Sequence, residues 1–259
     1  MIMRIFKHDS FPYLLLFVVA ALIIIPLGWA RSKIDPEFLP GVLVESFGFL
    51  MDVVFLGIFI VVFNSITEKK RKIERYKEEI DDYRGWNENE ASHRIGGLVK
   101  RLIKLKVQNL DLSQCFLEQV HFINFKLLKA NFYNANLGQS HFKNLELRES
   151  IFSYCNFEKA AIHNTDFSMS EMKWVNFTKA DLSDSDFSFA NLTNGQFIDT
   201  DMDNVKLNET NLSFARFYNV KNITYDQLRM ANSLYKCEGI PAEIEKQLLK
   251  THQWLYEEP

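Results

Sequence analysis

The sequence predicts an α+β membrane protein, built from a transmembrane helical hairpin, a helical neck, a coil of short parallel strands and a helical cap. Two long apolar runs lie before the basic stretch that begins at Lys69. From Leu112 to Phe217 every fifth residue is apolar. The net charge of −3 divides into −1 for residues 1–65, +4 for 66–106, −4 for 107–222 and −2 for 223–259. We expect four segments with these boundaries.

The two apolar runs are long enough to cross a membrane. The stretch Ser10–Ala30 carries no charged residue, and Val42–Phe63 is interrupted only by Glu45 and Asp52. A helix needs about 20 such residues to span the hydrocarbon core. Because the linker Arg31–Pro40 is short, the two spans are expected to form a hairpin. The first run exceeds the apolar core of a signal peptide, so cleavage is not expected.

The distribution of basic residues predicts the orientation. Six basic residues follow the second span: Lys69, Lys70, Arg71, Lys72, Arg75 and Lys77. Basic residues next to spans favour the cytoplasmic side. We therefore expect a cell (inner) membrane protein with both termini and the repeat segment in the cytoplasm. An odd number of cysteines, Cys115, Cys155 and Cys237, agrees with a reducing compartment.

The second span continues into the neck as one helix, from about Val42 to Tyr83. Apolar residues recur on a seven-residue period in two seams three residues apart. The predicted oligomer seam consists of Phe59, Ile66, Ile73, Tyr76, Ile80 and Tyr83. Two interpretations stay open: association with further copies of the chain, or packing of this helix on its own chain.

Glu45 and Asp52 are candidate intramembrane site residues. A spacing of seven puts them on one helix face, with Asp52 about 10 Å deeper. Carboxylates in a membrane are costly and usually face a partner, a cavity or an ion path. They could line a cation pathway in an oligomer. Alternatively, Glu45 lies at the interface while Asp52 is protonated or bonded to the neighbouring span, which is the reading we favour.

A second neck helix is expected over Glu88–Lys106, with an apolar stripe from Ile95 to Ile103 opposite basic residues. Such a helix could lie on anionic lipid headgroups or cap the next segment. Its position immediately before the repeats favours the cap.

A strict five-residue period governs residues 112–217. Its 22 apolar positions are ten Phe, nine Leu, two Met and Ile162, and 19 of the 22 positions two residues earlier are small. The exceptions are Leu110, Phe125 and Leu145. A helix would distribute such positions all around its surface, and a flat strand would alternate their faces. The period fits a short strand segment followed by a corner, with four such units closing one coil.

This coil makes a checkable claim about the interior, because residues at positions i and i+20 should stack. One expected ladder is Leu117, Leu137, Phe157, Phe177, Phe197 and Phe217; another is Leu112, Phe132, Phe152, Met172, Leu192 and Leu212. Contacts between these residues at other spacings are not expected. Coils would stack by parallel pairing about 4.8 Å apart.

The pattern Ala-(Asp/Asn)-Leu-X-X resembles the pentapeptide-repeat superfamily. It occurs at Ala135-Asn136-Leu137, Ala180-Asp181-Leu182 and Ala190-Asn191-Leu192. The resemblance covers Leu112–Phe217, although Cys115–Lys129 departs from it. It implies a right-handed quadrilateral β-helix, and it implies a helical end-cap in the tail Ile223–Pro259.

The sequence predicts no enzyme. It contains no nucleophile–base set, phosphate loop or metal cluster, so no catalytic residue, cofactor or metal is expected. The function that requires the fewest assumptions is a membrane-anchored scaffold, whose repeat faces bind an unknown protein partner. The expected partners are therefore membrane lipid, further copies of the chain and that protein, and nucleic acid is not expected.

Two further hypotheses remain. One is an oligomeric membrane effector or channel, with a possible stress or phage-defence role, that uses Glu45 and Asp52. The other is mimicry of DNA, as in soluble pentapeptide-repeat proteins that bind DNA gyrase. It rests on an acidic face made of Asp181, Asp184, Asp186, Asp199, Asp201 and Asp203. The plainer reading of these six is a solvated polar surface.

Overall fold

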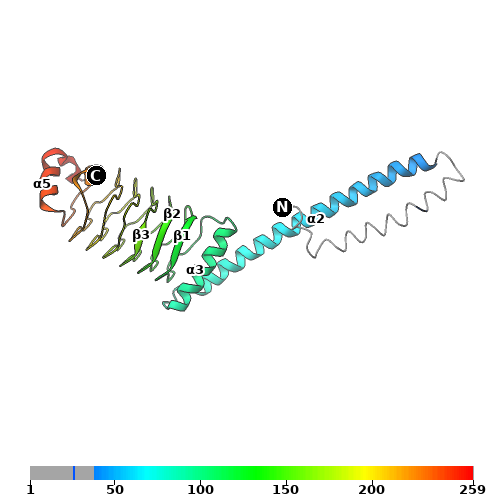
Figure 1. The fold of residues 1–259 in the computed structure, drawn as a ribbon, viewed down its shortest axis with the longest axis horizontal. Coiled ribbons are helices and arrows are strands. Elements are labelled where there is room, and N and C mark those ends of the chain that lie inside the picture. The colour runs from blue at the N-terminus through cyan, green and yellow to red at the C-terminus, as the bar shows by residue number, and fades with distance from the viewer. Residues whose placement is uncertain (1–25, 27–37, 259) are drawn as a thin grey trace. The chain divides into compact units, whose positions relative to one another are not determined.

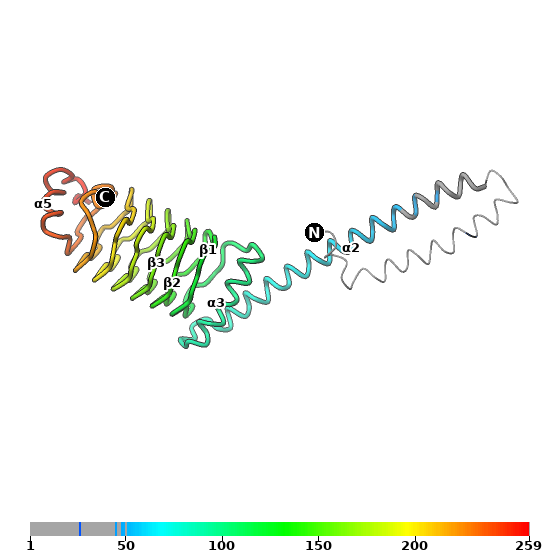
Figure 2. Tube along the Cα trace, viewed as in Figure 1, coloured from blue at the N-terminus to red at the C-terminus, as the bar shows by residue number. Residues whose placement is uncertain are grey.

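The computed structural model describes residue 26 and residues 38–258 (Figures 1 and 2). The predicted first span Ser10–Ala30, and with it the hairpin, lies outside the described residues. The chain divides into two compact units, residues 1–72 and 73–259. Each unit is treated by itself below.

Helix α2 runs over Phe38–Asp82, as one helix across the predicted second span and into the neck. In the described part of the chain, it is the one helix long and apolar enough to cross a membrane. Ten of its apolar side chains between residues 49 and 66 are 40 to 64% exposed. They are Phe49, Met51, Val54, Phe55, Leu56, Ile58, Phe59, Val62, Phe63 and Ile66. Val53, Ile60 and Val61 are half-buried instead, and they share one face of the helix because successive residues point about 100° apart.

The second unit begins with two packed helices. Helix α3, Asn89–Lys104, buries Ala91, Ile95, Leu98, Val99 and Leu102 in the core. The Ser92 hydroxyl donates to the Glu118 carbonyl at 2.5 Å, which joins α3 to the first coil. α3 thus closes the first end of the coil (Figure 1), as expected for a cap.

Parallel stacking of position i on position i+20 organises the segment from Asp111 to Lys221. Asp111 pairs with Asn131, Asn131 pairs with Ile151, and Ile151 pairs with Glu171. Backbone hydrogen bonds join the same neighbouring coils: the Leu112 amide, for example, donates to the Asn131 carbonyl. Each coil contains four five-residue units, and like units lie above one another in successive coils (Figure 2).

Every unit ends in a corner residue with left-handed backbone. From Asn109 to Asn219, each fifth residue has a positive φ, and none of these corner residues is glycine. Asn and Asp occupy ten of these positions, in keeping with their tolerance of this conformation. The chain therefore turns these left-handed corners without glycine.

The interior consists of stacked side chains. Phe157, Phe177, Phe197 and Phe217 stack in sequence with ring centroids 5.0 to 5.5 Å apart, which confirms the predicted ladder. The expectation that ladder residues meet only their counterparts in adjacent coils is wrong. The Phe152 and Phe157 rings are 5.8 Å apart. The coil is narrow enough for large rings on neighbouring units to touch across it.

Three strands lie along one edge of the first coils. They are β1 (His121–Lys126), β2 (His141–Glu146) and β3 (Ala161–His163), and they pair in parallel in the order β1-β2-β3. β1 and β2 contain Phe125 and Leu145, two of the large residues at a position that elsewhere is small. Both strands run through a corner residue with positive φ, Asn124 in β1 and Asn144 in β2.

The coil extends beyond the predicted boundary at residue 222. Asn211 pairs with Ser233 and Arg216 pairs with Glu238, so each partner lies two positions further along the chain than in the earlier coils. The additional residues are accommodated around helix α4, Tyr225–Leu228, whose N-terminus is capped by Thr224. Helix α5, Ala242–Thr251, and the 3₁₀-helix η2, Gln253–Tyr256, then complete the cap.

Candidate interaction surfaces

The cysteines serve as packing residues rather than as reactive groups. Cys115 and Cys155 are buried, and the Cys155 thiol donates to the Phe132 carbonyl at 2.8 Å. Burial raises the pKa of Cys115 and of Cys237 to about 12, so both stay protonated near neutral pH. Within residue 26 and residues 38–258, no group of His, Cys, Asp and Glu could hold a metal ion.

Glu45 and Asp52 are exposed on α2. Neither makes a hydrogen bond or ion pair with a residue that the structure describes. The structure thus places both carboxylates on the apolar part of the helix, and their role in an ion path stays a prediction.

The six seam residues separate into two groups. Phe59 and Ile66 are 64% and 52% exposed. Ile80 is buried in the core of the second unit, and Ile73, Tyr76 and Tyr83 pack against that core. The guanidinium of Arg101 on α3 lies 5.7 Å from the centre of the Tyr76 ring. The lower four residues therefore contact their own chain, and the seam's role between copies stays a prediction.

The outward side chains of the coil form four strips, one for each unit. Each strip is named by its paired residues. Strip 1 is Asp111, Asn131, Ile151, Glu171, Asn191 and Asn211; strip 2 is Phe116, Asn136, Asn156, Asn176, Gln196 and Arg216; strip 3 is His121, His141, Ala161, Asp181, Asp201 and Lys221; strip 4 is Lys126, Glu146, Asp166, Asp186 and Lys206. The four strips differ in chemistry, so each could meet a different partner.

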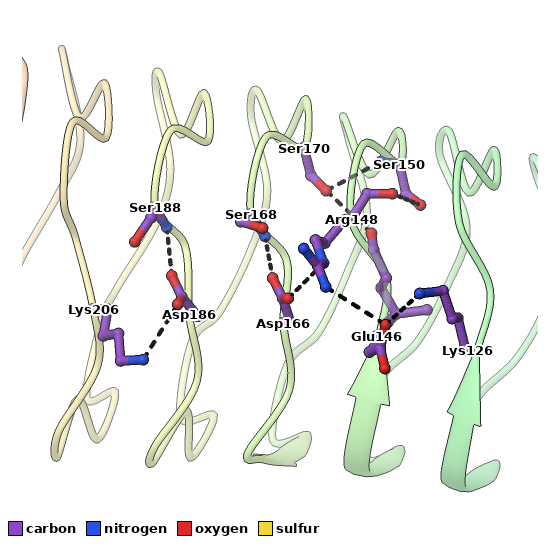
Figure 3. A network of polar contacts seen from close by, with 11 residues as sticks. Lys126, Glu146, Arg148, Ser150, Asp166, Ser168, Ser170, Asp186, Ser188 and Lys206 are labelled. Carbon is purple, nitrogen blue, oxygen red and sulfur yellow. Dashed lines mark hydrogen bonds and ion pairs between the residues drawn. The ribbon is translucent and has the colours of Figure 1, made fainter.

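Strip 4 carries ion pairs that join neighbouring coils, in one group around Glu146 and Asp166 and another at Asp186 (Figure 3). Lys126 Nζ lies 2.7 Å from Glu146 Oε2, and Arg148 Nε lies 2.8 Å from Asp166 Oδ2. The hydrogen bond from Lys126 lowers the pKa of Glu146. The pKa of Asp186 is lowered too: burial acts to raise it, but hydrogen bonds from Ser188 and the charge of Lys206 outweigh burial. The charges of strip 4 are thus largely satisfied within the chain.

Strip 2 carries an amide ladder. Asn156 donates to Asn136 at 3.2 Å, and Asn176 donates to Asn156 at 2.9 Å. Like strip 4, this strip uses its polar groups to join neighbouring coils.

Five of the six predicted acidic residues gather on strip 3 and its two corners. Asp181 and Asp201 are stacked neighbours in the strip, and Asp203 follows two residues later. Asp184 and Asp199 occupy the corner positions on either side. Asp186 instead belongs to strip 4, where it lies 3.4 Å from Lys206.

Strip 1 bears an apolar surface that the sequence interpretation missed. Large apolar residues occupy five left-handed corner positions, and all five flank this strip: Tyr154, Met169, Trp174, Phe189 and Phe214. With Tyr133 and Ile151 they form the apolar surface, and each side chain is 41 to 60% exposed. The Tyr154 and Trp174 rings stack at 6.4 Å. The signal was present in the sequence, as aromatic residues two positions after the interior residue of a unit.

A coil of stacked five-residue units defines a repeat architecture, in which each coil contacts only its neighbours and the stack offers extended surfaces. The sequence matches the family model for pentapeptide repeats in 8 copies, over residues 130–168, 170–208 and 185–221. Residues 130–221 are therefore similar to pentapeptide repeats. No catalytic family is shown, and no curated protein matches the chain.

Several solved structures are similar to the repeat segment. HetL of the cyanobacterium Nostoc sp. strain PCC 7120, involved in heterocyst differentiation regulation, has 20% identity over 48% of this chain and 59% of its own, with a TM-score of 0.27. The plasmid-mediated fluoroquinolone resistance protein QnrB1 has 10% identity over 56% and 87%, with a TM-score of 0.29. A pentapeptide repeat protein of the Arabidopsis thaliana thylakoid lumen has 20% identity over 42% and 67%, with a TM-score of 0.24.

Proposed function

We propose that this protein is a membrane-anchored interaction scaffold of the pentapeptide-repeat type, whose coil binds a protein partner through the apolar surface of strip 1. The observation that carries the proposal is the position of the large apolar corner residues. A left-handed backbone disfavours such side chains, yet Tyr154, Met169 and Trp174 occupy it where Asn would fit better. A local conflict of this kind is expected where function compensates for it.

The chemistry of the apolar surface indicates its partner. Stacked aromatic rings that stay about half exposed resemble the anchors of protein interfaces, where aromatic residues are enriched. Clusters of exposed apolar side chains like this one mark interaction sites on protein surfaces. The partner would present an apolar strip running along the coil, with polar groups facing Glu171 and Lys173, which pair with each other at 2.9 Å.

Anchoring is supported by α2. Ten of its apolar side chains over residues 49–66 are 40 to 64% exposed, and lipid would remove that surface from water. The basic residues from Lys69 onward would lie in the cytoplasm, on the side of the repeats. The predicted right-handed quadrilateral coil would then offer its strips to cytoplasmic proteins. The channel alternative would add to this anchor an ion path through Glu45 and Asp52.

Carbonate extraction of cell membranes tests the anchor. The full chain should remain in the membrane fraction, and Ile58→Lys with Val62→Lys should release most of it, because each charge near the centre of a span costs about 2.5–3.5 kcal/mol. The matched control, Ile66→Lys with Glu68→Lys, should stay membrane-bound because it lies at the basic end. Extraction of the unaltered chain would refute the anchor.

Site-specific photo-crosslinking in cells tests the docking surface. A photoreactive phenylalanine analogue at Trp174 should give a discrete adduct that the same group at Lys206 on strip 4 does not give. Replacing Tyr154 and Phe189 by Asn should reduce that adduct without unfolding the chain, because Asn suits the left-handed corner. Equal adducts from Trp174 and Lys206 would argue against a docking role for strip 1.

A further inference from the structure

Strip 3 is electrically polarised along the coil. With its corner positions, its first three coils cover residues 119–124, 139–144 and 159–164 and contain no Asp or Glu. They carry Lys143, Lys159 and three histidines, His121, His141 and His163. The next two coils carry one lysine, Lys179, against five aspartates: Asp181, Asp184, Asp199, Asp201 and Asp203. Over these five coils, one end of the strip therefore carries hydrogen-bond donors and positive charge and the other end carries acceptors, while Lys221 lies one coil beyond the acceptor end.

The donor end has few partners of its own. The His121 and His141 rings stack at 4.3 Å, and neither ring bonds to a described residue. Lys143 likewise makes no ion pair with a residue that the structure describes, whereas Lys159 pairs with Glu158 at 3.0 Å. Strip 4, in contrast, pairs its lysines within the chain at 2.7 and 3.4 Å. Strip 3 thus has charges of both signs that are available to a partner.

The aspartates of the acceptor end can also accept further hydrogen bonds. Asp181 Oδ1 accepts from the Ser183 amide at 3.1 Å, while its Oδ2 lies 3.7 Å from His163 Nε2. Asp201 Oδ1 accepts from Asn222 at 2.8 Å. A carboxylate oxygen can accept further bonds, so each aspartate can take a donor from outside.

From this polarity we propose that strip 3 is a self-association surface, on which a second copy of the chain packs antiparallel. The two copies are related by a two-fold axis that runs along the strand direction at the level of Ala161. A coil at a given distance before Ala161 then faces the coil of the second copy at the same distance after Ala161. His121 then faces Asp201 of the second copy, and His141 faces Asp181. Lys143 falls opposite Ser183, between Asp181 and Asp203 of the second copy. A parallel pair would instead oppose like charges.

Ala161 makes the close approach possible. It lies at the centre of the strip, paired with His141 on one side and Asp181 on the other, and it has the smallest side chain of the six. On the axis, Ala161 meets its own copy without steric obstruction. His163 and the corner residue Lys159 also meet their own copies there, and these are the unfavourable juxtapositions of the arrangement.

The proposed contact is small, and its size determines how strongly two copies associate. At about 4.8 Å per coil, His121 and Asp201 are about 19 Å apart. A strip of that length falls short of the roughly 800 Å² per partner of a standard interface. Association should therefore require a high local concentration, such as confinement in a membrane provides, and it should weaken with salt. It depends neither on the partner of strip 1 nor on the seam of α2.

Disulfide trapping of the full chain in detergent tests the arrangement. The parent carries Cys237→Ser, since Cys115 and Cys155 are buried. Ala161→Cys should form a disulfide-linked dimer about tenfold faster than Glu171→Cys, the equivalent position on strip 1, because pairing raises its effective concentration. His121→Cys should link to Asp201→Cys when the two variants are mixed, and not to itself. Equal rates for Ala161→Cys and Glu171→Cys, or self-linkage of His121→Cys, would overturn the proposal.

Charge variants provide the matched control. Asp181→Asn with Asp201→Asn should slow trapping at Ala161→Cys about tenfold, the result expected if close charge pairs add about 1.4 kcal/mol. Asp166→Asn with Asp186→Asn removes the same charge from strip 4 and should leave the rate unchanged. Thermal unfolding of both variants checks that they stay folded. An unchanged rate in the strip 3 variant would disprove the charge complementarity.

Discussion

Corner residues bear a backbone cost that their side chains can raise or lower. Asn194 has a φ of 62° and makes no side-chain hydrogen bond with a described residue. A left-handed backbone costs roughly 1–2 kcal/mol for most residues, but less for Asn. Asn at a corner therefore indicates that stability determines the residue at that position, and a large apolar residue there indicates that surface chemistry does.

The variant Asn194→Val should lower the free energy of unfolding by about 1–2 kcal/mol, because a β-branched side chain crowds a left-handed backbone. Asn194→Gly should be nearly neutral. Asn208→Val, one residue before a corner, is the matched control and should change stability by less than about 0.5 kcal/mol. Chemical denaturation measures all three. Equal effects of Val at the two positions would contradict the role of the corner.

Interior residues follow a different rule, because the coil has no room to relax. Phe157 is 0% exposed and stacks on Phe177 with ring centroids 5.2 Å apart. Phe157→Asp should abolish cooperative unfolding, since it buries an unpaired charge and leaves a cavity.

The exposed Phe189 gives the control for this substitution. It is 58% exposed and has a φ of 60°, so Phe189→Asp should not lower the free energy of unfolding, because Asp tolerates the left-handed corner. Similar melting temperatures for the two Asp variants would show that the interior is not a closed core.

At the level of elements, the end of α2 is fixed to the first coil by one side chain. Arg84 donates to Asp81 at 2.5 Å, to the Ser113 hydroxyl at 2.8 Å and to the Ser113 carbonyl. The next amide, that of Gly85, donates to the Gln114 carbonyl at 3.2 Å. This set of bonds holds the neck helix where Ile80 can reach the core.

Arg84→Ala should loosen this attachment by about 1.5–3 kcal/mol, the usual worth of hydrogen bonds to a charged group. Hydrogen exchange should then accelerate for amides of residues 73–83 and stay unchanged in the later coils. Arg84→Lys should rescue little, because Lys lacks the planar fork. Arg229→Ala, which removes an exposed pair with Asp226 at 2.7 Å, serves as the control. Uniform acceleration along the chain would show a global rather than a local effect.

Elements also show how far the sequence predicts this structure. The five-residue period predicts the stacking of Phe177 on Phe197 without any structural information, because position in the repeat determines the partner. It does not predict the pairing of Arg216 with Glu238, because two inserted positions remove the periodic signal there. The sequence also leaves the place of Ile80 undecided, since the same apolar spacing serves packing between chains and within one.

The candidate surfaces were only partly predictable for a related reason. Clustered aspartates, such as Asp181 and Asp201, stand out in the sequence, and their stacking follows from the spacing of 20. The apolar surface does not stand out, because Tyr154 and Trp174 lie in a chain already rich in aromatic residues. Only the coil shows that these two rings share a corner column and stay exposed.

For the whole molecule, the number of coils should be adjustable but the phase of the repeat should not. Deleting residues 161–180 removes one coil and joins Ala160 to Asp181, so inward and outward positions are kept. This variant should unfold cooperatively, because each coil contacts only its neighbours. Deleting residues 161–178 shifts the inward positions by two and should prevent folding. Circular dichroism during thermal unfolding distinguishes them, and two unfolded variants would refute independence of the coils.

A coil made of four identical-length units also constrains how such a gene can change. Duplication of four units adds a coil and leaves every downstream residue on its strip. Duplication of a single unit keeps the interior intact but moves all later side chains to the adjacent strip. Trp174 would then leave the column of Tyr154, and Asp201 would leave that of Asp181. A small heritable duplication could therefore rewrite the recognition surfaces of the protein while its fold survives.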